Sequence, residues 1–213
     1  AASALISIAP DFDRLIRRFG SRQIRSQATV CGNIANGSPV GDLPPAFIAL
    51  GAKLHIASAS GVREIQLEEF FVSYGEQDLA VGEYVESVVI PIEPALQFRC
   101  WKVSKRFDQD ISAVLGAFAA KVENGVINQA RICFGGMATT PKRAKKCETV
   151  LSGNVINNAT LSEAQQALAE DFDPITDFRA SSHYRRRVSQ NLLEKFFLTL
   201  SETDVPDVFA GMD

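Results

Sequence analysis

The sequence lacks the patterns that would place it in a membrane or on a nucleic acid. No apolar run approaches the roughly 18 residues that a membrane-spanning helix needs. Its 22 basic and 25 acidic residues leave a net charge of −3 and a pI of about 5.5. Such a balance provides no excess positive charge for nucleic acid or for an anionic lipid surface. We therefore expect neither nucleic acid nor a membrane among the partners of this chain.

Cysteine and histidine are scarce and scattered. The four cysteines contain no CxxC pair, and the two histidines are far apart, so no metal site, cluster site or catalytic histidine is indicated. We interpret the cysteines as reduced, mostly buried thiols of a cytoplasmic protein. These residues are Cys31, Cys100, Cys133 and Cys147, with His55 and His183.

Length and composition indicate a globular chain of one large or two small domains. It has 213 residues, of which 46% are hydrophobic and 22% charged. The first nine residues lack the positive start and the longer apolar core of a signal peptide. Because there is also no initiator Met, we expect a fragment or a processed product.

Residues 29–42 stand out because they combine three glycines with small polar and acidic side chains. Glycine lets a backbone turn with positive φ and lets another molecule approach it closely. Free backbone N–H groups in such a loop can bind phosphate. The alternative is an ordinary turn-rich connection, since turns favour the same residues. The residues concerned are Thr29, Gly32, Asn33, Asn36, Gly37, Ser38, Gly41 and Asp42.

Residues 32–45 read GNIANGSPVGDLPP, and this segment resembles the FAD-binding segment of the molybdenum hydroxylases. Within that family the likeness is greatest to the small, flavin and iron–sulfur subunit of bacterial xanthine dehydrogenases. The resemblance covers about residues 10–200 and includes the DFRASSHYRR segment near the C-terminus. Order, spacing and several downstream segments agree, which makes it more specific than a lone glycine motif.

The resemblance implies an α+β fold with two domains. Residues 1–94 would form the second half of a PCMH-type FAD-binding domain. Residues 95–202 would form a CO-dehydrogenase-flavoprotein-like C-terminal domain, a three-stranded antiparallel sheet packed with helices. Residues 203–213 would be a tail. In the family, a second glycine-rich loop and the iron–sulfur domain come before the matched region.

The function that the resemblance implies is electron transfer through FAD during purine hydroxylation, with NAD as the acceptor. Iron–sulfur clusters would belong to an N-terminal half of the small subunit, and the molybdenum cofactor to a large molybdopterin-binding subunit, in a higher oligomer. The flavin residues do not separate this from a flavoprotein subunit acting with an aldehyde, carbon monoxide or an aromatic substrate. A third interpretation is a non-catalytic fragment that docks to a partner subunit.

The resemblance also implies which residues hold FAD. Phe19 would lie against the isoalloxazine ring, Asp42 would bind ribose hydroxyls, and Lys102 would contact the flavin. Arg106 and Ile111 are weaker candidates beside the ring. The remaining cofactor residues would be Thr29, Val30, Cys31, Gly32, Asn33, Asn36, Ser38 and Val85.

The residues themselves leave alternatives open at these positions. Phe19 continues the apolar face of a helix and is equally suited to the core. Asp42 is placed to cap a helix over residues 43–51. Lys102 could be a solvated strand edge, although a cation near a flavin would favour its anionic reduced form. Cys31 stands where the family usually has glycine, and cysteine tolerates positive φ poorly.

Periodicity and turn signals predict the other elements. We expect a helix over residues 10–20 and a strand over 24–30 leading into the loop. A hairpin is expected around Gly61 and another around Asn124-Gly125. The remaining expectations are strands over 84–91, 97–106, 111–122 and 125–137, and helices over 141–151 (Thr140 as N-cap), 160–172 (capping box Thr160 to Glu163) and 177–200.

Overall fold

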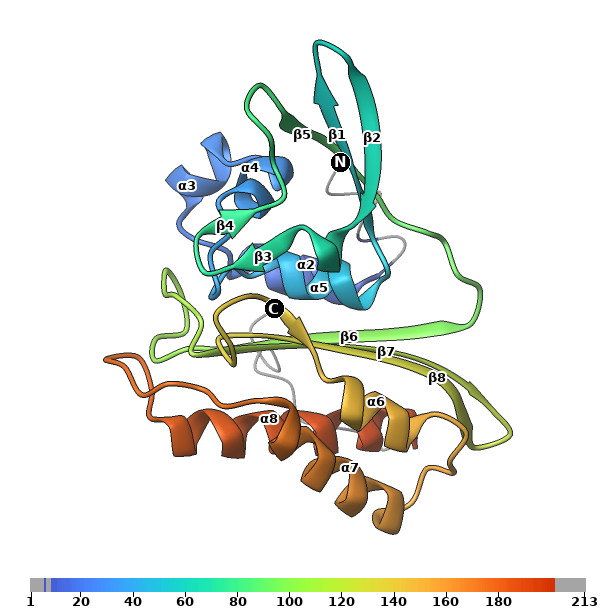
Figure 1. The fold of residues 1–213 in the computed structure, drawn as a ribbon. Helices are drawn as coiled ribbons and strands as arrows, with labels where there is room; N and C mark the ends of the chain where they lie inside the picture. The colour runs from blue at the N-terminus through green and yellow to red at the C-terminus, as the bar shows by residue number, and fades with distance from the viewer. Residues whose placement is uncertain (1–5, 7–8, 202–213) are drawn as a thin grey trace.

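The computed structural model describes residue 6 and residues 9–201 (Figure 1). The first half of this region contains four short helices beside a three-stranded antiparallel sheet of order β2-β1-β5 and a small β3–β4 pair. Its elements are α2 (Asp11–Arg17), α3 (Arg22–Gln27), α4 (Val30–Ala35), α5 (Leu43–Ala49), β1 (Lys53–Ser58), β2 (Gly61–Gln66), the 3₁₀ turn η1 (Leu67–Glu69), β3 (Phe71–Ser73), β4 (Glu76–Gln77) and β5 (Tyr84–Val89).

The second half is an antiparallel sheet of order β6-β7-β8-β9 with helices α6, α7 and α8 on one face. Helices α2 and α5 of the first half lie on the opposite face (Figure 1). The elements are β6 (Leu96–Val103), β7 (Val114–Glu123), β8 (Val126–Gly135), β9 (Lys142–Arg143), α6 (Lys145–Leu151), α7 (Asn158–Asp171) and α8 (Ser182–Leu200).

Strand β7 is buried on both faces because its side chains alternate between two cores. Leu115 and Ala117 belong to the core shared with the first half of the chain. Val114 and Phe118 belong to the core under α6, α7 and α8. The ring of Phe118 packs on Phe196 of α8 with centroids 5.2 Å apart. Successive strand residues point to opposite faces, so this sheet forms the middle layer of the molecule.

The α+β fold class is confirmed, and so are several local predictions. The helix at 10–20 is α2, the helix after Asp42 is α5, and the hairpin at Ser60-Gly61 joins β1 to β2. Asn124 and Gly125 both have positive φ and connect β7 to β8. In the described region all four cysteines are free thiols, and three of them are buried.

The strand predicted over residues 24–30 is wrong. Ser21 accepts a hydrogen bond from the Ile24 N–H and starts α3, while Thr29 accepts one from the Gly32 N–H and starts α4. Two side-chain caps therefore determine the structure where loose alternation suggested a strand. The first half of the glycine-rich segment is consequently helical, and only residues 36–42 form a loop.

The predicted starts of the C-terminal helices also need correction. The sheet has a fourth strand, β9, which pairs with β8 through Lys142 and Arg143, so α6 begins at Lys145 rather than at 141. Helix α7 begins earlier than predicted because Asn157, and not Thr160, is its N-cap. Ser181 caps α8, which therefore begins five residues after the predicted start at 177.

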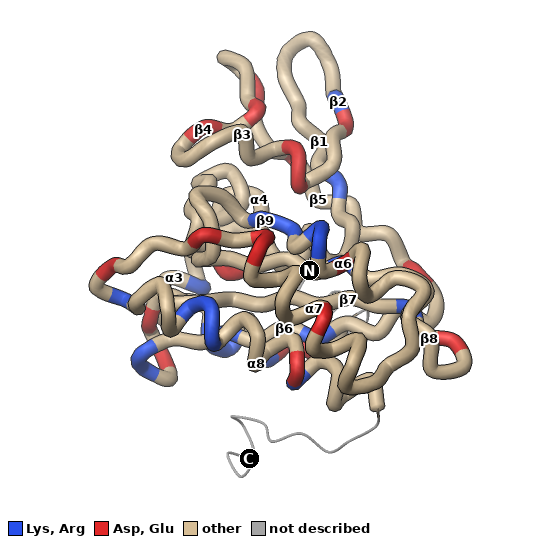
Figure 2. Tube along the Cα trace, turned by 60° about the horizontal axis from the view of Figure 1, so that its bottom comes forward, with Lys and Arg blue, Asp and Glu red and all other residues tan. Residues whose placement is uncertain are grey.

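Acidic residues lie beside basic ones in both halves of the molecule (Figure 2). Within residues 9–201, no helix combines the length and the apolar character needed to cross a membrane. The same part of the chain contains no group of three or more His, Cys, Asp or Glu side chains that could hold a metal ion. Residues 90–95 connect β5 to β6, at the predicted domain boundary, and the predicted tail at 203–213 lies outside the described residues.

Candidate functional site

A cavity of about 380 Å³ lies where the end of α2, helix α4 with its following loop, and the β6–β7 loop meet. It brings together six of the residues predicted for cofactor binding, although they come from sequence positions as distant as 19 and 102. Its wall consists of Phe19, Gly20, Ser21, Ile24, Asn33, Asn36, Ser38, Val40, Gly41, Asp42, Lys102, Gln109, Asp110 and Ile111.

Helix α4 presents Asn33 and Asn36 to the cavity because the two residues are three apart and share one face. The helix ends at Ala35 with Asn36 as its C-cap, and Gly37 follows with a φ of +62°, the left-handed conformation that suits glycine. A Cβ at Gly37 would lie only 1.8 Å from Nε2 of Gln77. The positive φ therefore favours glycine in the turn after α4, and this turn directs Ser38 and Asp42 back toward the same cavity.

Thr29 holds the other end of α4. Replacing Thr29 with alanine should lower the free energy of unfolding by about 0.5–2 kcal/mol, because the Gly32 N–H loses its 2.9 Å acceptor. Urea unfolding of the two proteins would measure this loss. Thr29→Ser keeps the oxygen and should restore most of the stability. A serine variant as unstable as the alanine variant would show that the methyl group, and not the cap, matters.

The side chain of Asn33 lacks a hydrogen-bond partner that its buried position calls for. Its Oδ1 atom is buried and has no hydrogen-bond partner among the described residues. A buried acceptor without a donor costs about 1–3 kcal/mol. Asn33 is part of the cavity wall, so a ligand with N–H or O–H groups would remove this cost if the side-chain amide turned toward it.

A buried ion pair forms the floor of the cavity. The Lys102 Nζ lies 2.6 Å from Oδ2 of Asp42, and the two side chains are 3% and 8% exposed. The Ser112 hydroxyl donates to the other carboxylate oxygen at 2.5 Å. Asp42 occupies the N-cap position of α5 but makes no side-chain capping bond. Its carboxylate instead connects α5 to β6 and to the residues before β7.

Arg18 fixes the loop that closes the cavity on its other side. Its guanidinium donates to the carbonyls of Lys102 and Phe107 at 2.6 and 2.9 Å and to the Ser104 hydroxyl at 2.9 Å. Burial lowers the pKa of Arg18 below its ordinary value, while the nearby charges of Asp42 and Asp108 act in the opposite direction. The side chain of the residue that caps the C-terminus of α2 thus sets the path of residues 102–107.

Phe19 lines the cavity and also packs against the core of the first half. Both of its proposed roles are therefore compatible with its position.

The remaining predicted residues lie outside the cavity wall. Val85 is buried in the core on β5. Thr29, Val30, Cys31 and Gly32 form the N-cap and first turn of α4. The Cys31 thiol is 3.5 Å from the Glu86 carbonyl, and burial raises its pKa. Cys31 is helical and is not among the described residues with positive φ, so this position does not require glycine.

Sequence reasoning missed Ser112 and Arg18. Ser112 is the only hydroxyl in the apolar run 111–120, and this isolation was a usable signal. Arg18 lies near the end of the helix predicted over residues 10–20, where its charge alone indicates no particular contact. Its role depends on contacts 84 to 89 residues away, which local patterns do not reveal.

Two family models match the chain and together cover nearly all of it. Residues 1–93 match the FAD binding domain in molybdopterin dehydrogenase. Residues 99–200 match the CO dehydrogenase flavoprotein C-terminal domain.

Similar proteins act on different substrates. A nicotinate hydroxylase of Emericella nidulans is 31% identical over 199 residues, which are 90% of this chain and 15% of that protein. The glyceraldehyde dehydrogenase medium chain of Sulfolobus acidocaldarius is 29% identical, over 90% of this chain and 68% of its own length. A xanthine dehydrogenase of Blastobotrys adeninivorans is 30% identical, over 88% of this chain and 14% of its own length. The chain thus spans about a seventh of two of these relatives.

Solved structures have the same fold. Quinoline 2-oxidoreductase from Pseudomonas putida 86 superposes with a TM-score of 0.83 at 25% identity, over 93% of this chain and 69% of that one. CO dehydrogenase from Oligotropha carboxidovorans gives a TM-score of 0.83 at 23% identity, over 90% of this chain and 67% of that one. The chain therefore belongs to the flavoproteins of the molybdenum hydroxylase family, with an FAD-binding domain followed by a CO dehydrogenase flavoprotein C-terminal domain.

Proposed function

We propose that the cavity between α2, α4 and the β6–β7 loop holds part of FAD and that the chain passes electrons through this FAD to NAD. The observation that carries the proposal is that one cavity gathers six predicted cofactor residues, among them Asn33, whose Oδ1 has no partner among the described residues. FAD has ribityl and ribose hydroxyls and ring N–H groups, so it offers the donors that this atom needs. Asn36 and Ser38 add further polar groups on the same wall.

Bound FAD would supply the hydride and electron chemistry, and the residues of the chain would place and tune it. Phe19 would cover the ring and exclude water from it. The Lys102 ammonium, held by Asp42, would favour negative charge on a nearby group. Ser112 and Arg18 would keep this pair and the loop in position.

The proposal extends to an assembly that hydroxylates a purine. An N-terminal iron–sulfur and FAD half of the same subunit would deliver electrons, and a large molybdopterin-binding subunit would oxidise hypoxanthine or xanthine. The relatives named xanthine dehydrogenase support this substrate class. The whole would be a higher oligomer of the two subunits.

A second candidate is a flavoprotein that serves another substrate of the same enzyme family. The chain is about as identical in sequence to a nicotinate hydroxylase and a glyceraldehyde dehydrogenase as to the xanthine dehydrogenases, which favours this candidate. The cavity does not separate these candidates, because in this proposal it would hold the electron-transfer cofactor rather than the hydroxylated substrate. A non-catalytic docking fragment is less well supported. Cysteine in place of glycine at position 31 would favour it by straining the FAD-binding segment, but Cys31 is helical.

The proposed function can be tested in the full-length flavoprotein that contains this chain. We expect a flavin absorption spectrum and release of FAD identifiable by mass. Asn33→Ala should weaken FAD binding about tenfold, since one hydrogen bond from a buried group is lost. Asn128→Ala, on an exposed position of β8, is the matched control and should bind FAD normally.

The same preparation distinguishes a xanthine dehydrogenase from a flavoprotein that serves another substrate of the family. NAD reduction with xanthine, nicotinate or an aldehyde as donor, after addition of the large subunit, would identify the substrate class. A full-length protein that stays colourless and takes up no added FAD would refute the electron-transfer proposal.

A further inference from the structure

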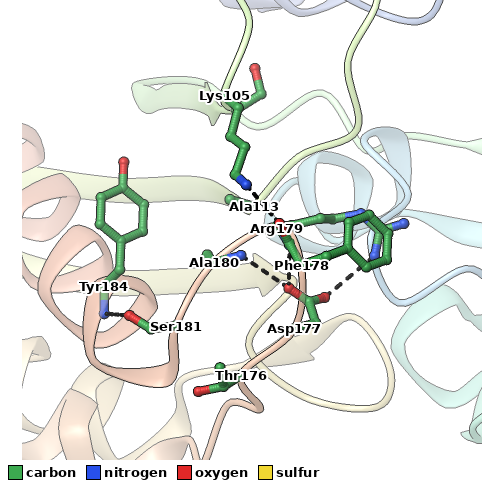
Figure 3. A pocket seen from close by; sticks show the side chains of 10 residues that line it. Lys105, Ala113, Thr176, Asp177, Phe178, Arg179, Ala180, Ser181 and Tyr184 are labelled. Atoms are coloured by element: carbon green, nitrogen blue, oxygen red, sulfur yellow. Dashed lines mark hydrogen bonds and ion pairs between the residues drawn. The ribbon is translucent and has the colours of Figure 1, made fainter.

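A second cavity, of about 550 Å³, lies between the start of the β6–β7 loop and the segment that leads into α8. This volume is within the range of small-molecule sites. It shares no wall residue with the cavity described above. The side chains that give it its chemistry are Lys105, Asp177, Phe178, Arg179, Ser181 and Tyr184 (Figure 3).

The acceptors on this wall are already occupied. Oδ1 of Asp177 accepts from the N–H groups of Arg179 and Ala180 at 2.9 and 3.0 Å. The same oxygen accepts from Arg185 at 2.8 Å, and Oδ2 pairs with the Arg179 guanidinium at 3.3 Å. The Ser181 hydroxyl accepts from the Tyr184 N–H at 3.1 Å. A ligand that brings donors would therefore find no free carboxylate here.

Donors, in contrast, remain available. Lys105 Nζ makes one bond, to the Phe178 carbonyl at 2.7 Å, and an ammonium has three N–H groups. The Arg179 side chain is 24% exposed, and among the described residues its guanidinium donates only to Asp177, at 3.3 Å, while its Nε–H has no acceptor. In the wall itself, Lys105 and Arg179 are two cations against the one carboxylate of Asp177, which leaves an excess of one positive charge. Asp177 is also paired from behind the wall by the buried Arg185. The wall is therefore suited to an anion.

Two exposed aromatic rings flank these cations. Figure 3 shows Tyr184 on one side of Lys105 and the Phe178–Arg179 pair on the other. Phe178 is 79% exposed, but its ring already carries the Arg179 guanidinium at 4.4 Å. Tyr184 is 48% exposed, and no described ring or cation stacks on it. Its face is therefore open to a planar ring.

We propose that this cavity binds a nucleoside monophosphate or a similar small phosphorylated ligand with a planar ring. Its phosphate would accept hydrogen bonds from Lys105 and Arg179, and its base would stack on Tyr184. Aromatic stacking on a base and charge-assisted hydrogen bonds to a phosphate each contribute measurably to binding affinity in such a site. The site is separate from the proposed FAD site and does not depend on it.

Calorimetric titration of the 213-residue chain with AMP tests this, with adenosine, ribose 5-phosphate and inorganic phosphate as further probes. We expect AMP to bind more tightly than any of the other three. Lys105→Met should weaken AMP binding about ten- to a hundredfold, because a bond to a charged group is lost, and Tyr184→Ala should weaken AMP but not phosphate. Lys146→Met, at an exposed lysine of α6 that pairs with Glu170, is the matched control and should bind as the parent does.

Three results would overturn the proposal. The first is that AMP gives neither heat nor shifts of the amide signals of residues 104–113 and 176–184. Phosphate binding as tight as that of AMP would indicate an anion site without base recognition. Loss of AMP binding in Asn33→Ala, together with normal binding in Lys105→Met, would place the nucleotide in the first cavity. The two variants thus separate failure of this site from failure of the proposed FAD site.

Discussion

Asp42→Ala should lower the free energy of unfolding by about 3–5 kcal/mol, the cost of leaving one member of a buried ion pair without its partner. The Lys102 ammonium, in a side chain only 3% exposed, would lose its carboxylate. The Ser112 hydroxyl would also lose its acceptor. Urea unfolding without added flavin, followed by circular dichroism, measures this effect separately from cofactor binding.

The double variant Asp42→Ala, Lys102→Met should recover much of the lost stability, because removing both charges removes the unpaired one. Glu170→Ala breaks the exposed pair with Lys146 and should change stability by no more than about 0.5 kcal/mol. A loss below about 1 kcal/mol for Asp42→Ala would show that Lys102 reaches water or another acceptor.

Arg185→Met is the second substitution with a large expected effect, again about 3–5 kcal/mol at neutral pH. The Arg185 side chain is 2% exposed and pairs with Asp177 at 2.8 Å. It also donates to the carbonyls of Ala113 and Gly136, which precede β7 and follow β8. Methionine would fill much of the space but leave two carbonyls and a carboxylate without this donor.

The effect of Arg185→Met should depend on pH. Burial alone would raise the pKa of Asp177, but the N–H groups of Ala180 and Arg179 and the Arg185 guanidinium lower it from 3.8 to about 2. Because the folded pKa is below the unfolded one, this stabilisation is present above about pH 4 and is lost as the pH falls toward 2. The variant and the parent should therefore differ most at pH 7 and least near pH 2.

Arg187→Met is the matched control, since it removes an exposed arginine two residues further along α8. Its stability should stay within about 0.5 kcal/mol of the parent. A difference between parent and Arg185→Met that is constant from pH 7 to pH 2.5 would contradict the role given to Asp177.

Long periodic elements with strong turn signals could be predicted from the sequence. Helix α2 followed from apolar spacing, and the β7–β8 hairpin followed from Asn124-Gly125. Short elements could not be predicted in this way, because the hydrogen bonds of their N-cap residues determine where they form. Residues 24–30 have little periodicity, and the hydrogen bonds of Ser21 and Thr29 made two six-residue helices there.

The candidate site was predictable only in part, for a related reason. The resemblance identified Asp42 and Lys102 separately, and alternation in β6 places Lys102 on the same face as Phe98 and Cys100. Their pairing depends on how this face packs against α5, which sequence alternation does not encode. The Ser112 contact depends on the same packing.

The alternating burial of β7 has a consequence for how the protein unfolds. Each core contains side chains of this one strand, so neither half can open without exposing apolar surface of the other. The chain should therefore melt in one cooperative transition, and the amides of β7 should be among the slowest to exchange with solvent. Cutting the connection at residues 90–95 would not release two independently folded fragments.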